Sequence, residues 1–147
     1  MQLLQATQSD LAQLTPLFDA YRVFYQQASD PIACQDFLLK RLARAESTIF
    51  LARNAEGQGV GFTQLYPSFS SVRMRRLWVL NDLFVHTSHR RRGVGKALLQ
   101  RAADWAKETG ASALMLETGV NNLPAQALYE ALGWERNDGY YVYYLSV

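Results

Sequence analysis

Between Leu77 and Gly110 the sequence passes from an apolar run, through a segment rich in arginine and glycine, to an amphipathic segment. The run "LWVLNDLFV" (Leu77–Val85) is apolar almost throughout, which is typical of a central strand buried on both faces. The segment from Val94 onward repeats apolar residues at helical spacing and stops at Gly110, so it predicts a helix. A buried strand that leads directly into a helix indicates a sheet covered by helices.

The segment between this strand and this helix, "RRRGVGK" (Arg90–Lys96, here called the basic turn), is suited to an anion. Gly93 and Gly95 lack side chains, so several backbone N–H groups can converge on one anion at the helix N-terminus. Cations at that end oppose the helix dipole unless an anion binds there. We therefore predict a phosphate or pyrophosphate site, with a purely structural turn as the alternative.

Two standard nucleotide motifs do not match the basic turn. Lys96 is followed by Ala97, where a P-loop requires serine or threonine, and the earlier glycine of the P-loop is missing. Leu98 occupies the place of the third glycine of the dinucleotide fingerprint. The anion site therefore belongs to another class.

The rest of the chain predicts one mixed α/β domain over residues 1–147. Capping signals at Thr7 and Asp30 open two helices, and a hairpin of alternating strands follows them. After the basic turn and its helix come a buried strand, a short helix and a closing strand. The expected elements are helices within 6–27 and 29–46, strands at 47–54 and 60–67, a strand at 112–118, a helix at 123–133 and a strand at 140–147. This order predicts an antiparallel portion joined to a parallel pair.

Composition excludes several classes of protein. Fifteen basic and thirteen acidic residues give a net charge of +2, which argues against a nucleic-acid partner. Cys34 is the single cysteine, so neither a disulfide nor a cysteine metal site is expected, and we predict no metal. No leader segment and no run long enough to cross a bilayer stands out, so we expect a cytoplasmic protein without a membrane partner.

A second motif, "NNLPAQALYEALGW", follows the predicted strand at 112–118. Asn122 and Tyr129 lie two helical turns apart, so both side chains can address one face of a short helix. Pro124 suits the helix start, and Ala125 is small enough for close approach by a ligand. The alternative is that Asn122 is a plain N-cap and Tyr129 a core aromatic.

Together these segments resemble the two signatures of the GNAT superfamily of N-acetyltransferases, over roughly Leu77 to Trp134. Arg90, Gly93 and Gly95 match the Arg-x-x-Gly-x-Gly core of the first signature, and Asn122 to Trp134 match the second. The resemblance implies a GNAT-like acyl-CoA N-acyltransferase fold. In that fold a central mixed, mostly antiparallel sheet with a splayed parallel strand pair is flanked by helices.

The resemblance also implies acetyl-CoA as acyl donor. The basic turn would hold its pyrophosphate, the strand before it would hold the pantetheine arm through the backbone, and the tyrosine hydroxyl would lie beside the thioester sulfur. By position, the cofactor-binding residues are Leu83, Phe84, Val85, Arg90, Arg91, Arg92, Gly93, Val94, Gly95, Lys96, Asn122, Ala125 and Tyr129. Tyr129 is then the expected general acid.

The motifs say less about the amine acceptor than about the acetyl-CoA donor. The segment "NDLFV" resembles "EDLFV" of the spermidine/spermine and thialysine acetyltransferase branch, but Asn81 stands where that branch has glutamate. Asp82 is the expected catalytic or acceptor-binding carboxylate, and an ion pair with an arginine near Arg75 is its alternative role. Asn81, Asp82, Tyr66 and Arg75 are the expected acceptor contacts, the last two from the loop region before the buried strand.

These observations predict acetyl transfer to a primary amine of a small molecule (an amino acid, a polyamine or a similar compound) by direct attack in a ternary complex. A protein N-terminal or lysine acetyltransferase and a non-catalytic acyl-CoA-binding regulatory module are the alternatives. The tyrosine-rich segment "YYVYYLSV" (140–147) suggests a contact between two copies, so a homodimer is expected.

Overall fold

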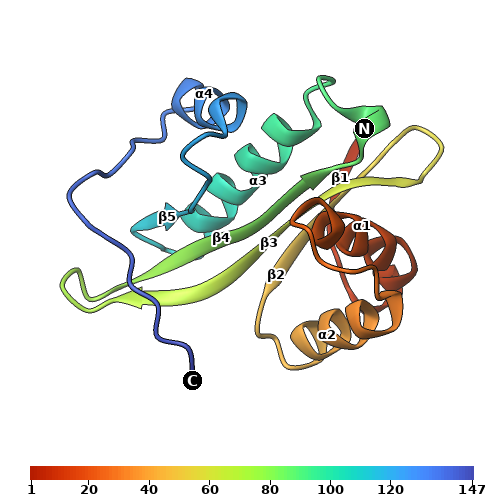
Figure 1. Cartoon of the computed structure of the whole chain (residues 1–147), viewed down its shortest axis with the longest axis horizontal. Helices are drawn as coiled ribbons and strands as arrows, with labels where there is room; N and C mark the ends of the chain where they lie inside the picture. The colour runs from red at the N-terminus through yellow and green to blue at the C-terminus, as the bar shows by residue number, and fades with distance from the viewer. The chain divides into compact units, whose positions relative to one another are not determined.

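The computed structural model describes residues 1–147, and these form two compact units, residues 1–116 and 117–147. Figure 1 traces the chain from the N-terminal unit in red to the end of the second unit in blue. That residues 1–147 form a single domain stays a prediction.

The first unit is built on a five-stranded sheet in the order β1-β2-β3-β4-β5 (Figure 1). The strands are β1 (Gln2–Gln5), β2 (Thr48–Arg53), β3 (Gly59–Ser70), β4 (Arg75–Val85) and β5 (Ala113–Met115). The first four pair antiparallel, and β4 and β5 are parallel. The mixed sheet with one parallel pair is therefore confirmed. Strand β1 was not predicted, because four residues are too few to show an alternation.

Helices cover both faces of this sheet. They are α1 (Leu11–Phe24), α2 (Pro31–Ala43) and α3 (Val94–Glu108). Ile49 and Leu51 of β2 join the core cluster that α1 and α2 build. Phe50, between them, contacts the Trp105 ring of α3 with centroids 5.9 Å apart. Since successive side chains of a strand point to opposite faces, α3 lies on the face opposite to α1 and α2.

Local capping chemistry fixes the ends of the helices as the sequence predicts. The Thr7 amide donates to Asp10 Oδ2 (2.8 Å) before α1, and the Ala33 amide donates to Asp30 Oδ1 (3.1 Å) at the start of α2. Gly110 ends α3 with a left-handed φ of +71°.

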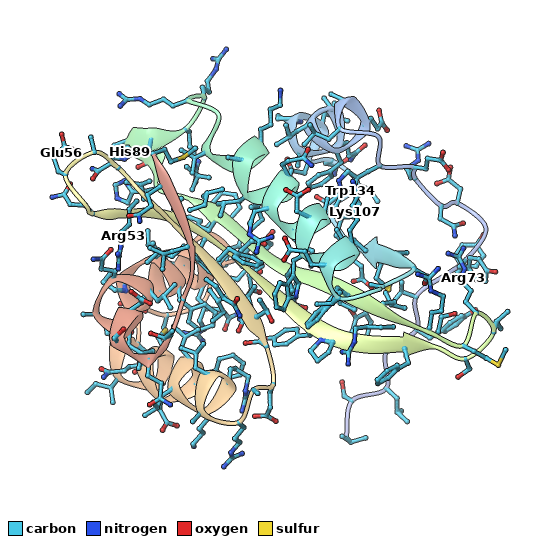
Figure 2. All side chains as sticks on the ribbon, turned by 180° about the vertical axis from the view of Figure 1, so that it is seen from behind. Arg53, Glu56, Arg73, His89, Lys107 and Trp134 are labelled. Carbon is cyan, nitrogen blue, oxygen red and sulfur yellow. The ribbon has the colours of Figure 1, made fainter.

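An ion pair between Asp10 and Arg53 (2.6 Å) joins the start of α1 to β2, and Arg53 is labelled in Figure 2.

A β-bulge interrupts β4 at Asn81. Leu80 pairs with Leu65 and Asp82 pairs with Gln64, so Asn81 is one extra residue between two regular pairs. Before the bulge, Trp78 contacts the Trp105 ring of α3 at 6.0 Å. After it, the side chains of the even-numbered residues turn to the other face, and Phe84 packs in the cluster below α1.

The parallel pairing of β4 ends just before this bulge. Strand β5 pairs only with Leu77 to Val79, whereas β4 continues to Val85. A bulge adds bend and twist to its strand, which accounts for the separation of β4 from β5 at this point. The last residues of β4 therefore present a backbone edge to which no strand is paired.

The second unit contains one helix, α4 (Leu123–Ala131), which Gly133 ends with a φ of +88°. The predicted strand at 140–147 is wrong, because this segment pairs with no strand. Tyr141 and Tyr143 are each 91% exposed. The alternating tyrosines indicate an extended chain, but a strand also requires a neighbour for its backbone groups, and the pattern alone supplies none.

Candidate active site

The backbone of the basic turn presents a row of free N–H groups. Arg91 (φ +61°) and Gly93 (φ +81°) both adopt the left-handed conformation, which is rare for an arginine. None of the six amides from Arg91 to Lys96 donates to another group of the protein, and no side chain caps α3. Consecutive free amides beside left-handed residues form the concave arrangement that binds anions.

Close packing fixes the start of α3 against the sheet. A Cβ on Gly61 of β3 would lie 2.9 Å from the Phe84 carbonyl oxygen and 3.2 Å from Val94 Cγ1. Only glycine permits this approach, so the first turn of α3 is held directly over β3 and β4.

The four cations of the basic turn divide into two roles. Arg90 is engaged within the protein, because its Nε donates to the Val85 carbonyl (3.1 Å) and its guanidinium lies over the rings of Phe24 (5.6 Å) and Phe84 (5.8 Å). Arg91, Arg92 and Lys96 are exposed and form no hydrogen bond or ion pair. These three charges, with the free amides, fit a pyrophosphate group.

Two histidines border the basic turn at the surface. The Ser88 hydroxyl lies 2.7 Å from His86 Nδ1 and 2.9 Å from His89 Nδ1. Figure 2 shows His89 at the opposite end of the sheet from Arg73. Both histidines thus contact the Ser88 hydroxyl in the short turn that leads into Arg90.

A pocket of about 390 Å³ lies between α1, α2, β3 and β4. Aromatic side chains from three of these elements line it, and they are Phe18 and Tyr21 of α1, Phe37 of α2 and Tyr66 of β3. Asn81 and Asp82 of β4 and Arg22 of α1 supply its polar groups. We call it the Asp82 pocket.

The bulge explains why two consecutive residues of β4 line the same pocket. In a regular strand Asn81 and Asp82 would point to opposite faces. Here the Asn81 side-chain amide donates to Asp82 Oδ1 (2.8 Å), and both side chains line the pocket. The extra residue is therefore the reason that both side chains of the sequence pair "ND" face one pocket.

Asp82 is a buried carboxylate held by hydrogen bonds. It is 2% exposed, and its Oδ2 accepts from the Gln64 side-chain amide. Burial raises the pKa of Asp82 above its ordinary value, although the hydrogen bonds from Gln64, Asn81 and Tyr21 act in the opposite direction. A carboxylate with a raised pKa is a better proton acceptor at neutral pH.

Two tyrosine hydroxyls accompany Asp82. The Tyr21 hydroxyl donates to the Asn81 carbonyl (3.3 Å), and burial and the Asp82 charge raise the pKa of Tyr21. Burial and the same charge raise the pKa of Tyr66 to about 12. Both hydroxyls therefore stay protonated at neutral pH and are hydrogen-bond donors.

The structure brings Asn81, Asp82 and Tyr66 together but not Arg75. The Arg75 guanidinium donates to the Gly110 carbonyl (3.2 Å) at the beginning of β4, about 23 Å along the strand from Asp82 at roughly 3.3 Å per residue. Figure 2 shows Arg73 at the tip of the β3–β4 hairpin. Asp82 takes part in no salt bridge, so its alternative role as an ion-pair partner of these arginines is wrong.

Sequence reasoning missed two residues that the structure places in or beside this pocket. Gln64 is fully buried in the middle of β3 and holds the carboxylate. The sequence feature that could have indicated Gln64 is a single amide side chain within the apolar segment "VGFTQLYP". Arg22 lines the pocket from α1, where it is the one cation among the aromatic residues Phe18, Tyr21 and Tyr25.

The second unit carries the other predicted motif. Asn122 is the N-cap of α4, and its Oδ1 accepts from the Ala125 amide (3.3 Å). The Tyr129 ring lies 6.0 Å from the Trp134 ring, and the Trp134 amide donates to the Tyr129 carbonyl (3.0 Å). The capping role of Asn122 is thus established, and it leaves the side-chain NH₂ as its remaining donor group.

No three of the histidine, cysteine, aspartate and glutamate side chains come together as a metal-binding group. None of the helices combines the length and apolar character needed to span a bilayer.

Comparison with known proteins identifies the class. Residues 12–134 match the model of the acetyltransferase (GNAT) family. The "uncharacterized N-acetyltransferase YhfO" of Bacillus subtilis (strain 168) is 47% identical over 147 residues, covering 100% of this chain and 98% of the relative. A crystal structure described as a probable acetyltransferase is 43% identical with a TM-score of 0.94, covering 100% of this chain and 98% of that one.

A more distant relative has a named substrate class. The aminoglycoside N(6')-acetyltransferase type 1 of Stenotrophomonas maltophilia is 28% identical over 117 residues, covering 78% of this chain and 74% of the relative.

The chain therefore belongs to the acetyltransferase (GNAT) family, and it is an enzyme of the N-acetyltransferase class. The family uses acetyl-CoA as acyl donor. The closer resemblance to the spermidine/spermine branch stays a prediction.

Proposed function

We propose that this enzyme transfers an acetyl group from acetyl-CoA to the primary amine of a small molecule bound in the Asp82 pocket. The observation that carries the proposal is a buried carboxylate with a raised pKa in a pocket of small-molecule size. Small-molecule sites typically enclose about 300–1,000 Å³. Asp82 also lies on the strand that leads directly into the basic turn.

The basic turn is the proposed site of the donor's pyrophosphate. The free amides from Arg91 to Lys96 would hold its oxygens, and the side chains of Arg91, Arg92 and Lys96 would balance its charge. The unpaired edge of β4 at Leu83, Phe84 and Val85 would hold the pantetheine arm. The remaining proposed donor contacts are Val94, Asn122 and Ala125. Arg90 fixes the position of the turn through its hydrogen bond to the Val85 carbonyl.

Proton transfers define the roles of two side chains. An alkylammonium has a pKa near that of lysine, about 10.4, so it must lose a proton before it attacks a carbonyl. Asp82 accepts this proton, while Asn81 and Tyr66 orient the amine. Acetyl-CoA supplies the thioester carbonyl; a C–N bond forms there and the C–S bond breaks. After the C–N bond has formed, the nitrogen releases its second proton to solvent. Tyr129 donates the proton that the departing thiolate takes up and regains one from solvent.

The first experiment tests the donor and the reaction together. Coenzyme A stabilises the native state by mass action, by about 2.7 kcal/mol at 100 times its Kd, so the melting temperature should rise. A panel of primary amines with acetyl-CoA should release free thiol. No release with any amine would contradict the proposed reaction, whereas a melting shift without release would favour a non-catalytic binding module.

Tyr129→Phe tests the general acid. Removal of the hydroxyl should lower kcat by about 100-fold, since general acid catalysis typically contributes about 10²–10⁴. The Kd for coenzyme A, measured by titration calorimetry, should change less than about twofold, because the ring remains. Tyr141→Phe, at an exposed tyrosine, is the matched control. An unchanged kcat in Tyr129→Phe would exclude the hydroxyl as proton donor.

A further inference from the structure

The Asp82 pocket contains one cationic side chain that no part of the reaction described above requires. Arg22 lines the pocket from α1 and is partly buried. Its Nη1 donates to the Ala28 carbonyl (3.3 Å) and lies 3.9 Å from Cys34 Sγ. Its Nε and Nη2 donate to no protein group, and Arg22 forms no salt bridge.

The acidic group closest in sequence to Arg22 is engaged elsewhere. Asp19 accepts from the Ser29 hydroxyl (2.7 Å) and from the Asp30 amide (2.8 Å). These hydrogen bonds lower the pKa of Asp19, with a smaller contribution from the Arg22 charge, and its carboxylate does not line the pocket. Three of the five N–H donors of the Arg22 guanidinium are thus available for a ligand.

We infer that the acceptor is a small zwitterion, an amine that also carries a carboxylate, and that Arg22 is the residue that selects it. This inference rests on the proposed function, because it assigns the amine end of the acceptor to Asp82. The carboxylate end then pairs with the free side of the Arg22 guanidinium. Arginine and carboxylate form two parallel charge-assisted hydrogen bonds, which makes this pair selective as well as strong.

Charge complementarity within the pocket argues against a polyamine acceptor. One carboxylate (Asp82) and one guanidinium (Arg22) are its charged side chains. The second ammonium of a diamine would meet the guanidinium and be repelled, whereas a carboxylate is attracted. The rings of Phe18 and Phe37 line the same pocket and supply an apolar wall for the carbon skeleton between the two charges.

The experiment compares acceptors that differ only in this charge. One series runs from glycine through β-alanine and 4-aminobutyrate to 6-aminohexanoate, and another contains L-amino acids; each acid is paired with its own carboxamide. Putrescine and spermidine represent the polyamines. We expect the best acid to exceed its amide in kcat/KM by about tenfold or more. The optimal chain length then measures the spacing between the two recognition groups.

Variants of Arg22 separate recognition from structure. Arg22→Gln should bring the acid-to-amide ratio of kcat/KM close to one, mainly through a higher KM for the acid, and Arg22→Lys should restore part of the ratio. Arg44→Ala is the control, because Arg44 is an exposed arginine outside the pocket. Melting temperatures of all variants report any loss of folding from the Ala28 contact.

The outcomes distinguish this inference from the proposed function. If amides or polyamines react as well as the acids, or if Arg22→Gln leaves the ratio unchanged, the inference is wrong while acetyl transfer stands. If no amine in any series releases thiol, the proposed function itself fails, and the inference fails with it.

Discussion

Burial of Asp82 disfavours its charged form, which is the form that the proposed reaction requires. Burial raises its pKa, which means that the folded state disfavours the charged carboxylate relative to the unfolded chain. The contribution of Asp82 to the free energy of unfolding is fully present below the pKa of an aspartate in the unfolded chain, about 3.9. It is lost as the pH rises through the pKa of Asp82 in the folded state. The proposed role of Asp82 as proton acceptor therefore requires the form of the side chain that folding disfavours.

Asp82→Asn tests both consequences. The variant should lose about 100-fold or more in kcat, the usual contribution of a general base. The melting temperature of the variant minus that of wild type should increase as the pH rises from about 4 to 8, because only wild type must ionise a buried group. Calorimetric melts across that range measure this difference, with Glu56→Gln, at an exposed carboxylate that forms no salt bridge, as control. A difference that does not change with pH would refute the assignment.

The turn before α3 depends on backbone conformation more than on side chains. Gly93 has a φ of +81°, and a Cβ there would meet no atom within 4 Å. Its substitution would therefore introduce backbone strain without a clash. Gly57, in the turn between β2 and β3, offers the same combination at φ +78°. The two glycines form a matched pair, one inside the proposed donor site and one outside it.

Gly93→Ala and Gly57→Ala should each lower the free energy of unfolding by about 1–2 kcal/mol, the cost of a left-handed L-residue. Only Gly93→Ala should weaken coenzyme A binding, by about tenfold in Kd, because strain there moves the free amides of the basic turn. Chemical denaturation and titration calorimetry give the two quantities. Equal Kd values for both variants would contradict a backbone role for this turn.

The elements that sequence reasoning predicted correctly are those with local causes. The Thr7 and Asp30 caps, the stop at Gly110 and the strand–turn–helix around the basic turn all depend on neighbouring residues. The errors concern partners distant in sequence. Strand β1 exists because β2 pairs with it, and the segment 140–147 is not a strand because nothing pairs with it.

The same distinction between local and distant residues applies to the candidate site. The basic turn is contiguous in sequence, so its residues could be named from the motif alone. The Asp82 pocket brings together residues from four elements, and the partners Gln64 and Arg22 lie 18 and 60 positions away from the carboxylate. Arg75 was predicted as an acceptor contact because it and Tyr66 were expected in one loop region. In the structure Arg75 lies at the beginning of β4, far along the strand from Asp82.

For the molecule as a whole, the exposed tyrosines of 140–147 remain the basis for expecting a homodimer. Exposed aromatic patches are typical of interfaces between chains. Analytical ultracentrifugation should find twice the chain mass of 16.7 kDa for wild type, and the chain mass for the double variant Tyr141→Ser/Tyr143→Ser. A wild-type protein that sediments as a monomer at every concentration would end this proposal.

The bulge at Asn81 has a consequence for how such a site can arise. Without Asn81, Leu80 and Asp82 would be neighbours in an uninterrupted ladder opposite Leu65 and Gln64, and every apolar residue of β4 would keep its present face. Loss of a single codon in the centre of a sheet normally inverts the inside and outside of everything downstream. In this strand the extra residue can be gained or lost with the hydrophobic pattern intact, so an ancestral scaffold could acquire it in one genetic event.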